Sequence, residues 1–212
     1  MENITTIFWD WNGTLLDDIQ ICIDSINIML KKRKKELITP EIYRKIFTFP
    51  VKDYYEKAGF DFTVEDFEKP AIEFIDIYTE KLVNAPLFKN TEEVLDYFKQ
   101  KYFPQYIISA MEQKSLIKSV NKRNIDNYFQ KIIGLNNHYA ESKIDRAKQL
   151  ISEISINPET ICLIGDTIHD YQVAKEIGCK CVLVANGHQN HKRLKTVNCL
   201  IVDKIKDIIG LF

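Results

Sequence analysis

The sequence predicts an α/β fold, a parallel Rossmann-like sheet with helices on both faces, and three observations support this prediction. Short, continuous apolar runs recur along the chain. From Asn90 onward a helix-like segment separates each run from the next, an alternation typical of parallel strands joined by right-handed crossover helices. Between Leu15 and about Pro86 amphipathic stretches replace the runs, which indicates a helical insert. The predicted strands cover residues 4–9, 105–109, 131–134, 161–165 and 180–185.

The first predicted strand delivers Asp10, and the dipeptide Asn12-Gly13 then breaks it, because both residues tolerate positive φ. In the insert that follows, apolar residues recur at three- and four-residue spacing, as in Phe74 and Tyr78, so helices fit and strands do not. We expect helices near 17–32, 40–47, 51–58 and 64–83. Two units are therefore predicted, an α/β core of residues 1–16 and 85–212 and a helical unit of residues 17–84.

The composition bounds the size of the fold and gives no sign of a strongly charged partner. With 212 residues and 45% hydrophobic content, the chain can bury one full core and leave about 70 residues for a smaller unit. The 29 Lys and Arg against 30 Asp and Glu give no reason to expect nucleic acid or a membrane surface as partner. The basic run of residues 31–35 is interpreted as the solvated end of a helix. Oligomeric state is not predicted.

The cysteines and the N-terminus indicate a cytoplasmic location. The five cysteines show no paired spacing of a zinc site and are interpreted as small buried residues in a reducing cytosol. The first apolar run is short and leads straight into charged residues, unlike a signal peptide. No apolar run reaches the roughly 18 residues that a membrane span needs.

Polar side chains gather at the predicted strand ends, where ligands bind in open parallel sheets. The residues are Asp10 after the first strand, Ser109 and Ala110 at the second, Asp166 with Asp170 after the fourth, and Lys143 at the start of the helix after the third. Neighbouring carboxylates repel one another unless a hard cation lies among them, and this oxygen set suits Mg²⁺ together with a phosphate oxygen. Lys143 and the donors near Ser109 complement a phosphate dianion.

Four segments, in this order and at these spacings, resemble the motifs of the haloacid dehalogenase-like hydrolases. They are DWNGTLLDD from Asp10, the triplet ISA that ends at Ala110, Lys143, and GDTIHD that ends at Asp170. The helical insert after the first motif resembles the small cap of the phosphoglycolate phosphatase-like branch. The stretch LVANGHQ after the fifth strand is similar to the active-site rim of that branch.

The resemblance implies a Mg²⁺-dependent phosphatase that acts on a small phosphorylated metabolite, with residues 17–84 as its cap domain. Asp10 is then the nucleophile that forms an aspartyl-phosphate. The implied Mg²⁺ ligands are the Asp10 carboxylate, the Asn12 carbonyl and Asp166, with Asp170 as a further ligand or an acceptor behind them. The implied phosphate-binding groups are Ser109, the N–H of Ala110 and Lys143, with Gly13 and Thr14 forming the turn that lets the backbone approach.

Position 12 departs from the phosphatase pattern, in which the residue two after the nucleophile is usually an Asp that acts as acid and then base. An amide cannot do this. Three interpretations stay open. Asn12 orients substrate while another group, with His169, Asp17 and Asp18 nearest in sequence, transfers the proton. Alternatively the substrate has a good leaving group, or the enzyme is slow. The third is a protein that binds phosphorylated ligands without turnover. A dehalogenase is less expected, because Asp166 and Asp170 indicate a metal.

Four further side chains are candidates for substrate contact. His169 precedes Asp170 at a predicted helix start, while His138 and His188 belong to loops expected near the same rim. Lys52 follows Pro50 in the insert and is a candidate partner for an anionic substrate.

Overall fold

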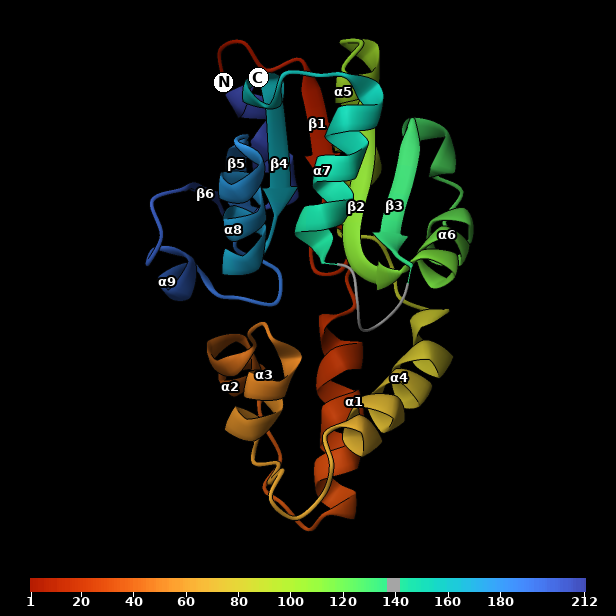
Figure 1. Cartoon of the computed structure of the whole chain (residues 1–212), viewed down its shortest axis with the longest axis vertical. Coiled ribbons are helices and arrows are strands. Elements are labelled where there is room, and N and C mark those ends of the chain that lie inside the picture. The colour runs from red at the N-terminus through yellow and green to blue at the C-terminus, as the bar shows by residue number, and fades with distance from the viewer. Residues whose placement is uncertain (137–141) are drawn as a thin grey trace.

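A parallel sheet forms the centre of the computed structural model, which describes residues 1–136 and 142–212 (Figure 1). Among these residues the sheet has six strands in the order β3-β2-β1-β4-β5-β6. The strands are β1 (Thr6–Trp9), β2 (Gln105–Glu112), β3 (Lys131–Leu135), β4 (Ile161–Gly165), β5 (Lys180–Val184) and β6 (Leu200–Val202). The order reverses at β1, which has β2 on one side and β4 on the other. The predicted α/β fold is confirmed.

Helices cover both faces of the sheet. Side chains on successive β1 residues point to opposite faces and so enter different cores. Ile7 and Trp9 belong to a core shared with α5 (Thr91–Gln100), α6 (Gln113–Asn121) and the 3₁₀ helix Ile205–Leu211. Phe8 belongs to the core on the other face, with α7 (Lys143–Ile154) and α8 (Ile168–Ile177). All four residues of β1 are buried, which explains their continuous apolar run.

The sheet contains one strand, β6, that was not predicted, and β2 is longer than predicted. β6 has only three residues at the edge of the sheet, and only the four-residue α9 (His191–Leu194) lies between β5 and β6. Such a short run gives little periodicity to detect. β2 continues past Ser109 to Glu112, with an irregularity in its pairing to β3 after Ile108.

Four helices form the insert, and they lie beyond the ends of the sheet toward which the strand arrows point (Figure 1). They are α1 (Ile19–Lys32), α2 (Pro40–Ile46), α3 (Val51–Ala58) and α4 (Glu68–Leu82). These helices share a core of their own, which includes Met29, Tyr43 and Tyr55. The chain enters and leaves the insert side by side, since Leu16 and Leu87 form an antiparallel bridge.

The insert contacts the core through the loop after β5. Arg44 Nε donates to the carbonyl of Gly187 at 3.2 Å, and Gln189 Nε2 donates to the carbonyl of Phe47 at 3.1 Å. The Phe47 ring stacks on the ring of His188 with centroids 4.7 Å apart. The structure therefore shows the insert closed against this loop.

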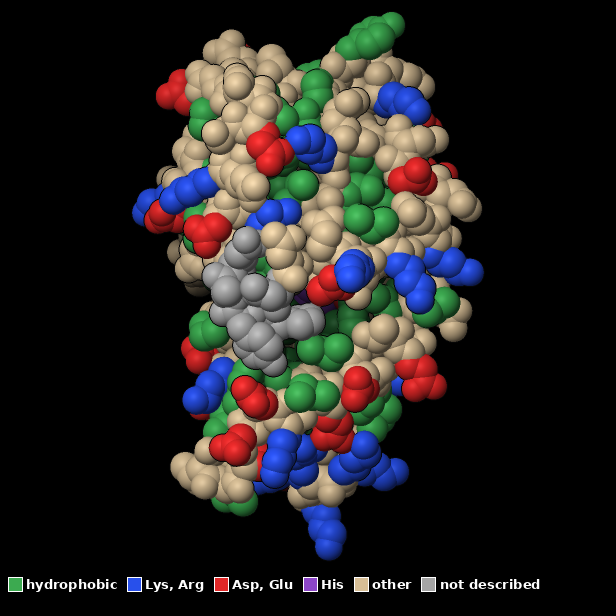
Figure 2. All heavy atoms as spheres, turned by 45° about the vertical axis from the view of Figure 1, so that its right-hand side comes forward, with side chains coloured by type: hydrophobic (Ala, Val, Ile, Leu, Met, Phe, Trp, Pro, Cys, Tyr) green, Lys and Arg blue, Asp and Glu red, His purple; other side chains and the backbone are tan. Residues whose placement is uncertain are grey.

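Charged side chains of both signs are spread over the surface seen in Figure 2, and basic ones gather at the end of the insert farthest from the sheet. Lys31 and Lys32 form the last turn of α1 at this end, as the sequence predicted for the basic run. None of the helices within the described ranges is both long and apolar enough to cross a membrane.

Arg33 joins three parts of the insert. Its guanidinium pairs with both carboxylate oxygens of Glu65, at 2.6 and 2.9 Å, and with Glu73 at 2.8 Å. Hydrogen bonds from Arg33 lower the pKa of Glu65 below its ordinary 4.5. Although partial burial opposes it, hydrogen bonds from Lys32 and Arg33 also lower the pKa of Glu73. This stabilisation is present above pH 4.5 and is lost as pH falls through the lowered pKa values.

We predict that Arg33→Met lowers the free energy of unfolding at pH 7 by about 1 kcal/mol, because partly exposed ion pairs contribute little more than this. The difference from the wild type should shrink as the pH falls below 4.5. Urea denaturation at several pH values measures both effects. Lys31→Met, at the exposed end of the same helix, is the matched control and should change stability by less than about 0.5 kcal/mol.

Candidate active site

Three acids lie together at the carboxyl ends of β1 and β4. Oxygen atoms of Asp10, Asp166 and Asp170 lie within 4.8 Å of one another, and all three residues are buried. Asp10 follows β1 and Asp166 follows β4, and these strands are paired in register, so the two carboxylates emerge side by side. Asp170 lies in the first turn of α8. The topology thus brings together the three acids that the sequence singled out.

Lys143 lies against this cluster. It is the first residue of α7, and its ammonium group donates to Asp10 and, at 2.6 Å, to Asp170. Ser142 caps α7 through a capping box, which fixes the start of the helix and so the position of Lys143. The Thr14 hydroxyl lies 3.2 Å from Asp10 Oδ2 and 3.1 Å from Asp166 Oδ1. One ammonium and one hydroxyl therefore bridge the three acids.

The pKa values of the three acids are shifted in different directions. Burial, with repulsion from Asp170, raises the pKa of Asp10, although Lys143 opposes this. Burial, with repulsion from Asp10 and Asp170, also raises the pKa of Asp166. Burial opposes ionisation of Asp170 too, but its contact with Lys143 outweighs this and lowers the pKa. A cation beside Asp10 and Asp166 would relieve the repulsion, and a set made only of carboxylate oxygens suits Mg²⁺.

Gly13, Gly165 and Gly187 leave room for this cluster. A Cβ atom at Gly187 would lie 2.1 Å from Asp166 Oδ2. A Cβ at Gly13, whose φ is +75°, would lie 2.4 Å from the His188 ring and 2.5 Å from Asp166 Oδ2. Gly13 and Thr14 lie in a turn, and the His188 ring lies against Gly13.

Ser109 and Ala110 are less closely joined to the site than the other predicted residues. Ser109 is buried on β2, beside β1, and its hydroxyl accepts a hydrogen bond from the Met111 N–H at 3.1 Å. Within the described part of the chain, no hydrogen bond links Ser109 to the three acids. Ala110 follows it in a half-buried position.

The Asn12 side chain is hydrogen-bonded to Asp18, which lies outside the cluster of three acids. Its amide nitrogen donates to Asp18 Oδ2 at 3.0 Å and to the Tyr78 hydroxyl at 2.7 Å. The Tyr78 hydroxyl in turn donates to Asp18 Oδ2 at 2.5 Å, and the Gly13 N–H donates to Asp18 Oδ1 at 3.0 Å. The side chain at position 12 thus helps to hold a buried carboxylate six residues later in the chain.

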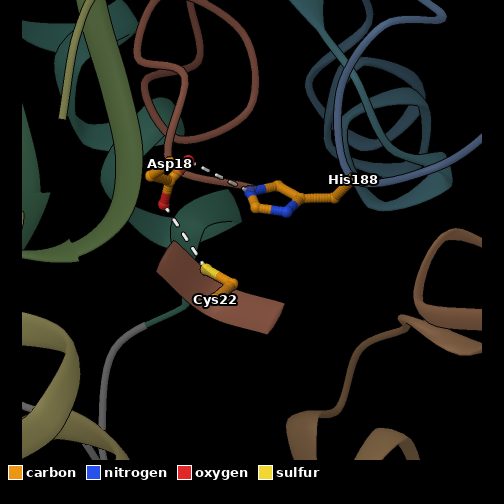
Figure 3. Close-up of side chains that lie close together, drawn as sticks. All are labelled: Asp18, Cys22 and His188. Atoms are coloured by element: carbon orange, nitrogen blue, oxygen red, sulfur yellow. Dashed lines mark hydrogen bonds and ion pairs between the residues drawn. The ribbon is translucent and has the colours of Figure 1, made fainter. Parts of the chain in front are cut away.

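Asp18 also pairs with His188 (Figure 3). The distance from His188 Nε2 to Asp18 Oδ1 is 3.5 Å, and the His188 Nδ1 atom shares a hydrogen bond of 2.8 Å with the Tyr43 hydroxyl. Although burial favours the neutral ring, Asp18 raises the pKa of His188 to about 9. Burial likewise opposes ionisation of Asp18, but His188 outweighs this and lowers the pKa. The two residues form a buried ion pair.

The remaining candidates lie elsewhere or outside the described residues. The His169 ring packs on Phe49 of the insert with centroids 4.7 Å apart, and burial lowers its pKa. The Lys52 ammonium lies over the ring of Phe62, 5.7 Å from its centroid. Asp17 donates its N–H to the Pro86 carbonyl where the insert meets the core. His138 falls outside the described residues.

Sequence reasoning missed Tyr43 and Tyr78, which contact His188 and Asp18. Both lie in amphipathic helices, where an aromatic residue at helical spacing is typical of core packing. Their polar contacts could not be predicted from nearby residues, because Tyr78 is 60 residues from Asp18 and Tyr43 is 145 residues from His188 in the sequence.

Comparisons with known proteins agree with this geometry. The model of a family described as haloacid dehalogenase-like hydrolase matches residues 7–184. Pyrophosphatase PpaX of Anoxybacillus flavithermus is 20% identical over 99% of this chain and 97% of its own length. Phosphoglycolate phosphatase of Chromobacterium violaceum is 19% identical over 92% of this chain and 90% of its own. A haloacid dehalogenase-like family protein from Streptococcus pneumoniae has a TM-score of 0.87 at 21% identity, with both chains fully covered.

We predict that Gly187→Ala lowers the free energy of unfolding by about 1 to 3 kcal/mol, because the added methyl overlaps the Asp166 side chain and the loop must shift. Gly210→Ala is the matched control, since a Cβ there meets nothing within 4 Å, and it should change stability by less than about 0.5 kcal/mol. Chemical denaturation of both variants measures the difference. Equal stabilities would contradict the close approach of Gly187 and Asp166.

Proposed function

Because the chain belongs to the haloacid dehalogenase-like hydrolase family, we propose that it is a Mg²⁺-dependent phosphatase of small phosphate monoesters. The reaction proceeds through an aspartyl-phosphate on Asp10. The observation that carries the proposal is the buried cluster of Asp10, Asp166 and Asp170 around the Lys143 ammonium. Relatives named as phosphatases cover most of the chain at about one fifth identity, which supports the same class of reaction.

We assign the Mg²⁺ ligands to the carboxylates of Asp10 and Asp166 and to the backbone carbonyl of Asn12. We assign Asp170 a position behind these ligands, where its oxygens accept hydrogen bonds from Thr167 at 2.6 Å and from Lys143 at 2.6 Å. When bound, the cation neutralises charge on the carboxylates and on the phosphate, which lets two anions approach each other.

We assign the other roles in the reaction to side chains of the site. Asp10 attacks phosphorus, the ester oxygen leaves, and water later releases phosphate from Asp10. Lys143 balances the negative charge of the phosphoryl oxygens, and Ser109 with the Ala110 N–H binds them from the β2 side. Thr14 orients Asp10 by its hydrogen bond to Oδ2. The insert, residues 17–84, acts as a cap domain that excludes water when it is closed.

The proton for the leaving group comes, in this proposal, from the pair Asp18 and His188. The family pattern makes position 12 the acid and base, so the leaving group is expected near that side chain. The Asn12 amide lies 3.0 Å from Asp18 Oδ2, so Asp18 is in direct contact with the side chain at position 12. A positioned acid and base of this kind is typically worth about 10² to 10⁴ in rate.

A second candidate function is hydrolysis of a substrate whose leaving group needs no proton, such as a phosphoanhydride. The amide at position 12 favours it, because such a substrate makes the missing acid unimportant. The relative named as a pyrophosphatase, which matches nearly the whole chain, supports the same idea. A panel of small phosphate esters and anhydrides, assayed with Mg²⁺, ranks the two candidates.

We predict that Asp10→Asn lowers turnover of p-nitrophenyl phosphate by at least about 10³-fold without unfolding the chain, because the nucleophile is lost. Removal of Mg²⁺ with EDTA should have a similar effect on the wild type. Steady-state assays with circular dichroism as a check on folding measure this. Asp24→Asn, an exposed acid on α1, is the control and should stay active. Full activity of Asp10→Asn would reject the mechanism, and a wild type inactive on every ester would favour a phosphate-binding protein without turnover.

We predict that His188→Gln and Asp18→Asn each lower kcat for an alkyl phosphate by about 10²-fold or more, and kcat for p-nitrophenyl phosphate much less. The alkyl leaving group needs the proton, whereas nitrophenolate does not. The double variant Asn12→Asp/Asp18→Asn moves the carboxylate to position 12 and should recover part of the alkyl rate. Equal losses on both esters, measured where dephosphorylation is not rate-limiting, would assign the proton transfer elsewhere.

A further inference from the structure

Figure 3 shows a second group of side chains that could hold a metal ion. Ligand atoms of Asp18, Cys22 and His188 lie within 4.8 Å of one another, and all three residues are buried. Cys22 lies in the first part of α1, four residues after Asp18, so both side chains lie on one face of the chain. His188 approaches from the loop after β5. The three ligand types differ from the all-carboxylate set of the first cluster.

The spacing of the cluster is close to that of a tetrahedral metal site. Cys22 Sγ lies 3.6 Å from Asp18 Oδ2, and His188 Nε2 lies 3.5 Å from Asp18 Oδ1. Zn²⁺ bonds of about 2.0 Å to oxygen or nitrogen and about 2.3 Å to sulfur set neighbouring ligands roughly 3.3 to 3.5 Å apart. Each of these two distances is close to the spacing of neighbouring ligands, and each is made to a different oxygen of Asp18.

The surrounding residues already hold the cluster in place. The Tyr43 hydroxyl is hydrogen-bonded to His188 Nδ1, which leaves Nε2 facing Asp18. Donors from Asn12, Tyr78 and Gly13 fix the Asp18 carboxylate. Such outer contacts orient ligands and strengthen metal binding.

Charge balance is compatible with a divalent cation. These side chains bind a metal in their deprotonated forms, as a carboxylate, a thiolate and a neutral imidazole. A divalent cation would take the place of the protons, since its two charges balance one carboxylate and one thiolate while the ring becomes neutral. A thiolate and an imidazole favour Zn²⁺ over Mg²⁺, so the two clusters are suited to different metals.

We propose that Asp18, Cys22 and His188 bind Zn²⁺ or a similar thiophilic divalent cation, and that this binding inhibits the enzyme. Cys22 belongs to the insert and His188 to the core, so a metal bound to both holds the insert closed. It also occupies the Asp18 and His188 pair. The inhibition, but not the binding, rests on the proposed phosphatase function.

Binding is tested with Co²⁺, whose spectrum reports thiolate ligation, added to the full chain in excess Mg²⁺. We expect one equivalent of Co²⁺ to bind with a thiolate-to-cobalt charge-transfer band. Cys22→Ser should abolish the band and weaken binding by at least about 100-fold, and Asp18→Asn, of nearly the same shape, should also weaken it. Cys199→Ser, a cysteine outside the cluster, should keep it. The absence of a band in the wild type, or a band that survives Cys22→Ser, would overturn the site.

Inhibition is tested by the ratio of turnover with and without Zn²⁺, each variant compared with its own zinc-free rate. Zn²⁺ should lower wild-type turnover by about tenfold or more at concentrations that leave Cys22→Ser unaffected. Equal inhibition of both proteins would overturn the regulatory role. Because the cobalt band does not depend on turnover, an inactive protein that binds Co²⁺ through Cys22 would reject the phosphatase proposal and support the site.

Discussion

The repulsion among three buried carboxylates is the constraint on which the rest of the site depends. Asp10, Asp166 and Asp170 lie within 4.8 Å of one another away from solvent, an arrangement that is unfavourable unless positive charge and donors compensate it. The fold supplies these from separate elements. The capped start of α7 delivers Lys143, the turn after β1 delivers Thr14, and the loop after β5 delivers the His188 N–H to Asp166 at 2.5 Å.

Asp18 is a second buried charge, and it is joined to the first group through the backbone of the same turn. The Gly13 N–H donates to Asp18, while the neighbouring Thr14 hydroxyl bonds to Asp10 and Asp166. His188 connects the two groups from the other side, since its ring pairs with Asp18 and its N–H with Asp166. A change of charge in one group therefore acts on the other across very few bonds, and through His188 it also acts on the contact with the insert.

Much of the fold and the acid cluster was predictable from the sequence, because both depend on local patterns. Continuous apolar runs indicated β1 to β5, and the parallel topology implied that residues after β1 and β4 meet. β6 was missed because three residues carry little periodicity. The contacts of Asp18 with Tyr78 and His188 were beyond reach, since they depend on how the insert closes on the core. The same holds for Cys22, whose partner His188 lies far away in the chain. The roles assigned to all of the site residues, among them Asp10, Ser109, Lys143 and Asp170, stay predictions.

The two segments that connect the insert to the core lie side by side at Leu16 and Leu87, close to the proposed nucleophile Asp10. The 14 residues of α1 extend roughly 21 Å from this point, so a rotation of about 10° displaces the far end of the helix by roughly 4 Å. The same rotation moves Asp18, at the near end, by only a small fraction of that distance. A change in the tilt of the insert would therefore leave Asp18 near Asn12 and Gly13, the residues to which it is hydrogen-bonded.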